Sequence, residues 1–343
     1  DPVFLEIRRT VPDFLQTVVR EKKRRSQVHA SEQSPEADLP WSPLDIATPE
    51  AFEELQALGR GMGINLTDHH HYAVRILCMS AGHKAAAALA HQDQAYGIFL
   101  APDMVLSDGS VAHLHPLAPS GKTVVMVSAC RFSLEDCFRE FHKSGLMASG
   151  EPLVLPPRKL VEMVFSGMHP ETACFEFDSP FFSNPATSAF WKVPGDSGVL
   201  LYSFFWAPLL VDFGGIDRHH AEYFDSGGTT DGKYIAMHFD PQRDVTPVTD
   251  SDEIFLAIFT PREDYSYPIR KGILKQLPVV NTLYKTFLIR RSLYGPMGDD
   301  MKRHLYLRPV RLHSHPLSPE WNKVEQRADE IVKRALNPPG LFG

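Results

Sequence analysis

The pattern of hydrophobic and polar positions predicts alternating strands and helices. Uninterrupted apolar runs bounded by turn residues are typical of buried strands, and capped stretches rich in alanine, leucine and charged residues are typical of helices. The expected strands are Gly63–Leu66, Ile98–Ala101, Lys122–Ala129, one or two strands within Val199–Val211, and Ile254–Phe259. The expected helices are Val3–Val19, Thr48–Leu58, Arg75–Gln92, Val111–Leu117 and Ser133–Ser144.

The succession of strand, helix, strand and helix between residues 98 and 144 indicates βαβ units. Such units build a largely parallel sheet that is covered by helices. We therefore expect the runs that end at Ala101 and Ala129 to be adjacent, parallel and buried strands. The later apolar run should break at Pro208, because proline has no N–H to donate to a neighbouring strand.

Composition and charge narrow the class of protein. The chain has 343 residues, 43% of them hydrophobic, and a net charge of −7, which is ordinary for a soluble enzyme and unlike a basic nucleic-acid binder. No apolar run is long enough for a transmembrane helix, and no signal peptide is evident. The 4 cysteines have no CxxC spacing, so we expect no intramolecular disulfide and a cytoplasmic protein.

Two acidic residues flank the end of the first expected strand of the βαβ region. Asp103 follows the run that ends at Ala101, and Asp108 precedes Gly109 and Ser110. Ligands of open α/β sheets bind at the carboxyl ends of strands, where an acid can hold a metal or a sugar hydroxyl. The alternative is structural, with Asp103 opening a turn and Asp108 capping a helix.

Further acids gather in the second half of the chain. Asp231 lies in a glycine-flanked loop, where backbone can approach a substrate closely, and Asp250 and Asp252 precede the strand expected at Ile254. A positioned carboxylate can act as a general base, and a pair of acids can fix a sugar or a cation. The alternative makes Asp231 a turn residue and Asp250–Glu253 a solvated face or a cap.

The 16 histidines include several close neighbours. In Asp68–His71, His69 and His71 would share a face only if the segment were extended, and a solvated polar loop is the commoner explanation. His313 and His315 are close in sequence, and His315 precedes Pro316, which favours an extended or turn conformation.

Several motifs together resemble one protein family. The motifs, in chain order, are Ala101–Ser110, Gly121–Val125, Pro157–Leu160, Met168–Pro170, Thr229–Gly232 and Val248–Glu253. This succession is similar to a bacterial glycosyltransferase-like family with the GT-A type of nucleotide-diphospho-sugar transferase fold. The resemblance extends from about Thr48 to Pro261. It implies a GT-A-like (Rossmann-like), mostly parallel mixed sheet that is flanked by helices.

The resemblance also implies site residues. The strand before Asp103 corresponds to the one that carries the Asp-x-Asp metal motif in GT-A enzymes, of which this chain matches one acid there. A C-terminal histidine completes the metal shell in many of these enzymes; His313 and His315 are both candidates, and we assign His315. The implied cofactor-binding residues are His169, Asp108 and Lys122.

These observations lead to one leading hypothesis and its rivals. We expect a glycosyltransferase that moves a sugar from a nucleotide-diphospho-sugar to an acceptor with Mn²⁺ or Mg²⁺ at Asp103. Asp231 would be its general base, and Asp250 and Asp252 would contact sugar or metal. The alternatives are a degenerate glycosyltransferase fold that acts as a binding or assembly subunit, a glycan-modifying enzyme that has lost donor binding, and a metal-dependent hydrolase or phosphoesterase that uses histidine and aspartate clusters.

The expected domain organisation has three parts. Residues 1–47 form a helical and loop segment, residues 48–265 the catalytic domain, and residues 266–343 an extension that packs on it. Between Arg270 and Arg311 the extension is both basic and apolar. Such a segment can lie on an anionic membrane surface or clamp a diphosphate, but more often its long cationic side chains cover the edge of a core.

Overall fold

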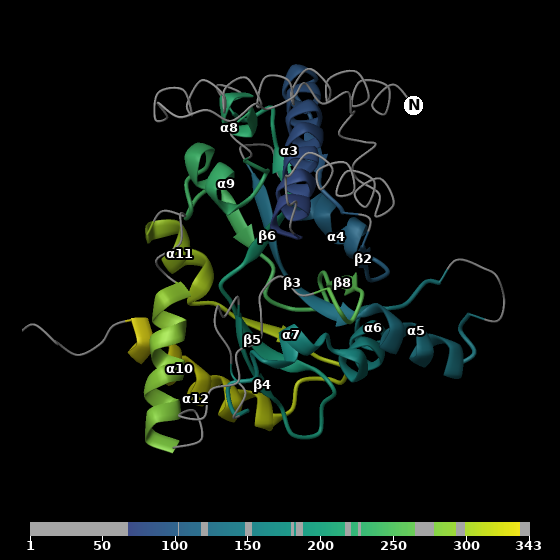
Figure 1. Ribbon diagram of the computed structural model, residues 1–343, viewed down its shortest axis with the longest axis vertical. Coiled ribbons are helices and arrows are strands. Elements are labelled where there is room, and N and C mark those ends of the chain that lie inside the picture. The colour runs from purple at the N-terminus through teal and green to yellow at the C-terminus, as the bar shows by residue number, and fades with distance from the viewer. Residues whose placement is uncertain are drawn as a thin grey trace, which may run out of the picture. The chain divides into compact units, whose positions relative to one another are not determined.

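The computed structural model describes residues 68–101, 103–117, 123–147, 153–179, 182, 188–216, 221–225, 228–264, 278–292 and 299–336. They fall into two compact units (Figure 1). Described residues of the first unit lie within 68–97 and 212–234, and those of the second within 98–211 and 235–336. The elements predicted before residue 68 and the candidate Lys122 lie outside the described residues.

The first unit is built around one long helix. The helix α3 (Asp68–Gln92) extends the predicted one toward the N-terminus and packs against α8 (Ala221–Asp225). The Ser80 hydroxyl of α3 donates a hydrogen bond of 2.6 Å to the Gly228 carbonyl. Residues 68–71 are helical, so the extended backbone considered for the histidine run does not form.

A six-stranded mixed sheet has the order β1-β6-β3-β8-β2, and β7 also pairs with β3. The strands are β1 (Tyr96–Ile98), β2 (Met104–Leu106), β3 (Val124–Ser133), β6 (Trp206–Asp212), β7 (Val245–Pro247) and β8 (Leu256–Thr260). The predicted α/β class is confirmed. The expectation of a mostly parallel sheet is wrong, because β3 is parallel to β7 and β8 but antiparallel to β6, and β2 is antiparallel to β8.

The predicted adjacency of the first two strands is also wrong. The strand β6 lies between β1 and β3, and Ile98 in β1 remains 47% exposed. The reason is that β6 is a longer and more apolar strand, which buries more surface beside β3 than the three residues of β1 can. The prediction for β3 itself is confirmed, because it is a continuous and largely buried strand.

The strands β7 and β8 follow one another along the same edge of β3. Pro247 pairs with Met126 and Leu256 pairs with Ala129, both in parallel register. Between them the chain leaves the sheet at residues 248–255 and returns in the same direction. This excursion contains the sequence Thr249-Asp-Ser-Asp-Glu253.

A second sheet of three strands has the order β4-β5-β9 and is antiparallel throughout. Its strands are β4 (Ser188–Lys192), β5 (Val199–Ser203) and β9 (Pro309–Leu312).

In the larger sheet, the predicted break at Pro208 is wrong, since Pro208 lies inside β6. The register shifts between Val125 and Met126 opposite it, and such a bulge lets a strand accommodate a residue without an N–H.

Helices cover both sheets. They are α4 (Ser110–Leu117), α5 (Leu134–Lys143), α6 (Pro157–Val164), η1 (Phe165–Gly167), α7 (Pro170–Ala173), α9 (Gly232–His238), α10 (Pro278–Ser292), α11 (Asp299–Tyr306) and α12 (Pro319–Leu336). The predicted helix after β3 is confirmed, and the Ser133 side chain caps it by accepting from the Asp136 N–H. On one face of the larger sheet, Leu114 of α4 joins a core cluster with Val127 and Leu256.

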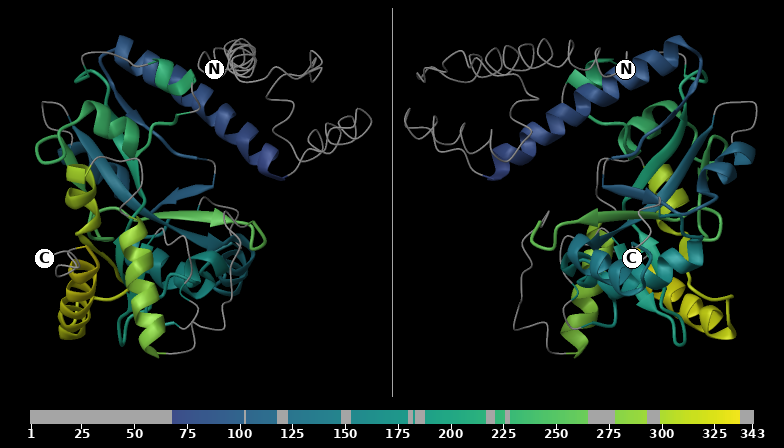
Figure 2. Two further views of the ribbon diagram at one scale, coloured as in Figure 1. Left: turned by 60° about the vertical axis from the view of Figure 1, so that its left-hand side comes forward. Right: turned by 90° about the vertical axis from the view of Figure 1, so that its right-hand side faces the viewer.

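The C-terminal stretch is part of the second unit. Its helices α10 and α12 pack against each other, as the left view of Figure 2 shows. Its strand β9 completes the smaller sheet beside β5. None of the helices in the described part of the chain is long and apolar enough to cross a membrane. Cys130 and Cys137 are buried free thiols, and the buried Cys174 thiol contacts the Pro170 carbonyl.

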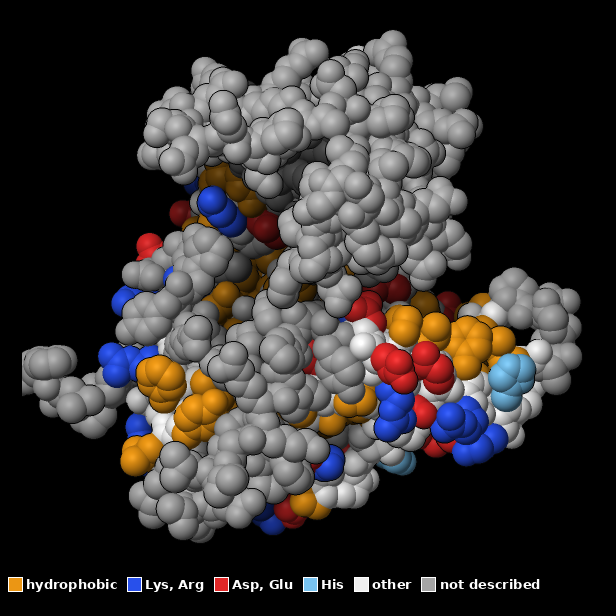
Figure 3. Space-filling model, in the orientation of Figure 1, with side chains coloured by type: hydrophobic (Ala, Val, Ile, Leu, Met, Phe, Trp, Pro, Cys, Tyr) orange, Lys and Arg blue, Asp and Glu red, His pale blue; other side chains and the backbone are white. Residues whose placement is uncertain are grey.

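The surface of the described residues mixes both signs of charge. Figure 3 shows acidic and basic side chains interspersed on one face. On α5, for example, Asp136 contacts both Arg139 and Arg262 at 3.0 and 2.6 Å. Exposed pairs of this kind contribute little to stability, because water screens them.

Candidate metal centre

The excursion between β7 and β8 connects the two sheets. The Arg311 N–H of β9 donates to the Thr249 carbonyl at 2.8 Å, and the Ser251 N–H donates to the Arg311 carbonyl at 2.9 Å. Residues 249–251 therefore continue the smaller sheet alongside β9, while both ends of the excursion belong to the larger sheet. This backbone pairing holds Asp250 and Asp252 at the end of β9, where the chain continues into His313.

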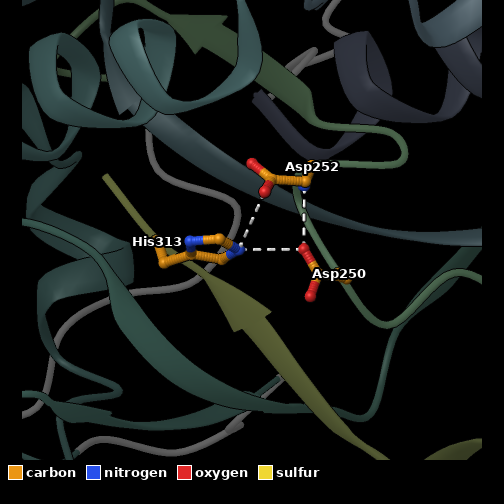
Figure 4. A group of neighbouring side chains, drawn as sticks. All are labelled: Asp250, Asp252 and His313. Atoms are coloured by element: carbon orange, nitrogen blue, oxygen red, sulfur yellow. Dashed lines mark hydrogen bonds and ion pairs between the residues drawn. The ribbon is translucent and has the colours of Figure 1, made fainter. Parts of the chain in front are cut away.

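His313 points between the two carboxylates (Figure 4). Its Nε2 atom lies 2.9 Å from Asp250 Oδ1 and 3.8 Å from Asp252 Oδ2. Its Nδ1 lies 2.7 Å from the His315 carbonyl, which can only accept, so Nδ1 carries a proton. The lone pair of the neutral imidazole is then on Nε2, the nitrogen that faces the acids. A hydrogen bond from the distal nitrogen to a carbonyl commonly orients a metal-ligating histidine.

The electrostatics of the cluster favour the charged forms of both partners. Burial alone would lower the pKa of His313, but its hydrogen bonds to Asp250 and the His315 carbonyl, together with the nearby carboxylates, raise that pKa. Burial alone would raise the pKa of Asp250, but the bonds from His313 and the Asp252 N–H lower it. Without a cation, both shifts therefore favour an ion pair between the two side chains.

The side chains of Asp250, Asp252 and His313 could hold a metal ion together. One ligand atom from each lies within 4.8 Å of the others. Carboxylate oxygens suit Mg²⁺ and Mn²⁺, and an imidazole nitrogen makes the set better suited to Mn²⁺ than to Mg²⁺. The donor set and its fixed histidine tautomer therefore fit a divalent cation.

Arg158 approaches the cluster from the first turn of α6. Its Nε lies 3.0 and 3.1 Å from the two oxygens of Asp252, and its Nη2 lies 2.6 Å from Asp252 Oδ2. The Arg158 and Asp252 side chains are 42% and 39% exposed, so solvent reaches the pair. Hydrogen bonding to Asp252 raises the pKa of Arg158, and the charges of Asp250 and Asp196 act in the same direction.

The turn between β4 and β5 is hydrogen-bonded to the residue that follows His313. Asp196 accepts hydrogen bonds from the Gly198 N–H and from both the N–H and hydroxyl of Ser314. The same turn lines a cavity of about 390 Å³ whose other walls include Phe165 and Met168. That volume is sufficient for a small ligand. The turn thus connects the cavity to the segment that carries His313.

The candidate acids Asp103 and Asp108 lie at opposite ends of β2. The Asp103 carbonyl accepts from the Phe259 N–H near the end of β8, whereas Asp252 lies before the beginning of β8. Asp108 lies at the Asp252 end, because β2 is antiparallel to β8, and its N–H donates to the Leu155 carbonyl. Asp103 is therefore not part of the group of described residues that could hold a metal ion together.

The histidine selected from the sequence differs from the one that the structure selects. The exposed His315 contributes its carbonyl to His313 Nδ1, and its own ring contacts the Ser314 hydroxyl at 2.8 Å. Spacing alone could not separate the two histidines. The distinction arises because His313 directly follows β9 and is buried beneath Trp321, whereas His315 lies in the following bend.

Asp231 belongs to the first unit and has several hydrogen-bond partners. It accepts from Tyr223 Oη at 3.0 Å, Thr229 Oγ1 at 3.1 Å, and the N–H groups of Lys233 and Tyr234 at 2.9 and 3.2 Å. These bonds cap the beginning of α9. They favour the structural alternative for this residue over a general base. Its predicted placement in a cavity with Asp103 stays a prediction.

His169 is fully buried at the beginning of α7. Its Nδ1 accepts from the Glu171 N–H, and its Nε2 lies 3.1 Å from the Pro261 carbonyl. Burial lowers its pKa, and the adjacent Arg131 acts in the same direction. The structure gives His169 a capping role at the beginning of α7.

Sequence reasoning named Asp250 and Asp252 as sugar or metal contacts, but it missed their Asp-x-Asp spacing and the contribution of Arg158. Asp250-Ser-Asp252 has the Asp-x-Asp spacing that was sought at Asp103, so this signal was present in the sequence. Arg158 lies within the Pro157–Leu160 motif, but its partner Asp252 is 94 positions away. A one-dimensional pattern does not reveal such a pair.

Comparisons with known proteins give no family assignment. No family model, curated protein or solved structure matches this chain.

Proposed function

We propose that this protein is a glycosyltransferase that uses a divalent cation and transfers a sugar from a nucleotide-diphospho-sugar to an acceptor. The observation that carries the proposal is the convergence of Asp250, Asp252 and His313, with Nε2, the nitrogen that has the lone pair in the neutral imidazole, facing the acids. The resemblance of the motif order to GT-A glycosyltransferases supports it. The proposal assigns the cation to these three residues, in place of Asp103 and His315, which were expected from the sequence.

The proposed chemistry depends on charge neutralisation. When bound, the cation neutralises the negative charge that develops on the diphosphate leaving group. Asp250 and Asp252 supply the oxygens that hold it, and His313 is kept in the required tautomer by the His315 carbonyl. The cavity beside Asp196 offers the acceptor a largely apolar wall from Phe165, Met168 and Val199. Apolar walls with a few polar groups are typical of small-molecule sites.

One observation favours a second candidate, a binding or assembly subunit without catalysis. Arg158 contacts both oxygens of Asp252, so a complete set of charge partners exists without any cation. In this alternative the cluster only joins the two sheets. A hydrolase with two histidine ligands is less well supported, because the converging group in the described part of the chain contains one histidine.

Direct measurement of cation binding tests the proposal. Electron paramagnetic resonance should detect stoichiometric Mn²⁺ binding by the wild type and a large loss of affinity in Asp250→Asn and Asp252→Asn. Asp178→Asn is a matched control, because Asp178 also pairs with an arginine but lies on another surface. A nucleotide-sugar panel with Mn²⁺ should then show donor hydrolysis or transfer. A wild type that binds no Mn²⁺ would favour the structural alternative.

A further inference from the structure

The ion pair between Arg158 and Asp252 occupies a proposed cation ligand. Both oxygens of Asp252 accept hydrogen bonds from the guanidinium. Asp252 Oδ2 also lies 3.8 Å from His313 Nε2. A cation that takes Asp252 as a ligand must therefore share or displace these hydrogen bonds. The pair is partly exposed on both sides, so water can replace its contacts as they break.

The charge of the cluster changes when a cation binds. In the absence of a cation, Arg158 is the positively charged side chain that holds Asp252. A divalent cation held by both acids and His313 balances the two carboxylates by itself. The positive charge of Arg158 is then available to an anion.

Arg158 is suited to receive that anion. Its guanidinium can form two parallel hydrogen bonds to a phosphate as readily as to a carboxylate. Arg158 lies in the first turn of α6, whose N-cap residue Pro156 supplies no side-chain hydrogen bond to that turn. The guanidinium and this end of the helix both attract negative charge, and a cation held by Asp252 would do the same.

We propose that Arg158 exchanges partners during substrate binding. In the cation-free protein it holds Asp252, and cation binding to Asp252 releases the guanidinium to bind the diphosphate of the donor. This inference rests on the proposed function and names Arg158 as the residue that couples cation binding to diphosphate binding. The order follows from the contacts, because Arg158 engages both Asp252 oxygens until the cation competes for them.

Two binding measurements on Arg158→Gln test the exchange. The first is Mn²⁺ affinity by electron paramagnetic resonance, and the second is the affinity for pyrophosphate by equilibrium dialysis at saturating Mn²⁺. The wild type should bind pyrophosphate only when Mn²⁺ is present. The variant should bind Mn²⁺ at least as tightly as the wild type, because a competitor is gone. Its pyrophosphate affinity should fall by about tenfold or more, as expected for the loss of a charge-assisted hydrogen bond.

A purely structural ion pair would behave differently. Loss of Arg158 would then weaken Mn²⁺ binding, because Asp252 would lose its orientation, and this result would overturn the exchange. Unchanged pyrophosphate affinity in the variant would also overturn it while leaving the proposed cation site intact. If the wild type binds no Mn²⁺, the proposed function fails first. Arg327→Gln is the matched control, because Arg327 forms a comparable two-nitrogen pair with Asp178 and should change neither affinity.

Discussion

At the scale of the residue, His313 and Asp250 make stability depend on pH. The folded pKa of His313 is raised, so its contribution is complete below the unfolded value of 6.5 and is lost as the pH rises through the folded pKa. The folded pKa of Asp250 is lowered, so its contribution is present above 3.8 and is lost as the pH falls through the folded pKa. Arg158 stays charged throughout this window, because hydrogen bonding to Asp252 raises its pKa.

We therefore expect the metal-free protein to have a higher melting temperature at pH 5.5 than His313→Gln does, and this difference should shrink at pH 8.5. Thermal unfolding in the presence of a chelator measures it. Substitution of His315 by Gln should leave the pH dependence unchanged, since that side chain is exposed. A difference between wild type and His313→Gln that grows with pH would contradict the prediction.

Asp231 offers a second prediction at this scale, because capping and catalysis respond differently to two substitutions. Asparagine and aspartate are both good N-cap residues, whereas alanine loses the cap at a cost of about 0.5–2 kcal/mol. We expect Asp231→Ala to lower the free energy of unfolding by about this amount and Asp231→Asn to retain most of it. Denaturant unfolding measures both. A folded Asp231→Asn variant whose turnover falls by about 10²–10⁴ would instead identify Asp231 as the general base.

At the scale of the element, the start of β5 packs directly against the end of β9. A Cβ atom added to Gly198 would lie 1.8 Å from the Leu312 carbonyl oxygen, which is backbone and cannot move alone. Gly198→Ala should therefore destabilise the protein by about 1–3 kcal/mol or more, and it should weaken Mn²⁺ binding because His313 follows Leu312.

Gly82→Ala is the contrasting variant for the same unfolding measurement. Gly82 lies inside α3 with nothing within 4 Å of an added Cβ, so alanine should stabilise that helix by up to about 1 kcal/mol. If Gly198→Ala unfolds at the same denaturant concentration as the wild type, the backbone contact between β5 and β9 is not as described.

At the scale of the whole molecule, cation binding should stabilise the second unit. The ligands come from the excursion of the larger sheet and from the end of the smaller one, so unfolding of either sheet separates them. At a free Mn²⁺ concentration 100 times Kd, linkage gives about 2.7 kcal/mol of added stability. The melting temperature should rise by several degrees in the wild type and stay unchanged in Asp250→Asn. An equal rise in both proteins would place the bound Mn²⁺ elsewhere.

Local sequence patterns determined several elements of this protein. The β-branched run at Val124–Ala129 predicted a buried strand, and Ser133 with the acids behind it predicted the helix α5. These predictions succeeded because strand burial and helix capping depend on neighbouring residues. The acids at residues 250 and 252 were also chosen from the sequence, because they form an acidic pair just before an expected strand.

The tertiary structure decided the rest, because it depends on contacts between distant positions. The order of the larger sheet depends on which strand pairs with β3, and β6 pairs with it instead of β1. His313 rather than His315 became the candidate ligand because β9 delivers it to Asp250 across 63 positions. Arg158 reached Asp252 across 94 positions. Such pairs form only when distant segments of the chain meet in a common core. The periodicity of the sequence does not show which segments will meet.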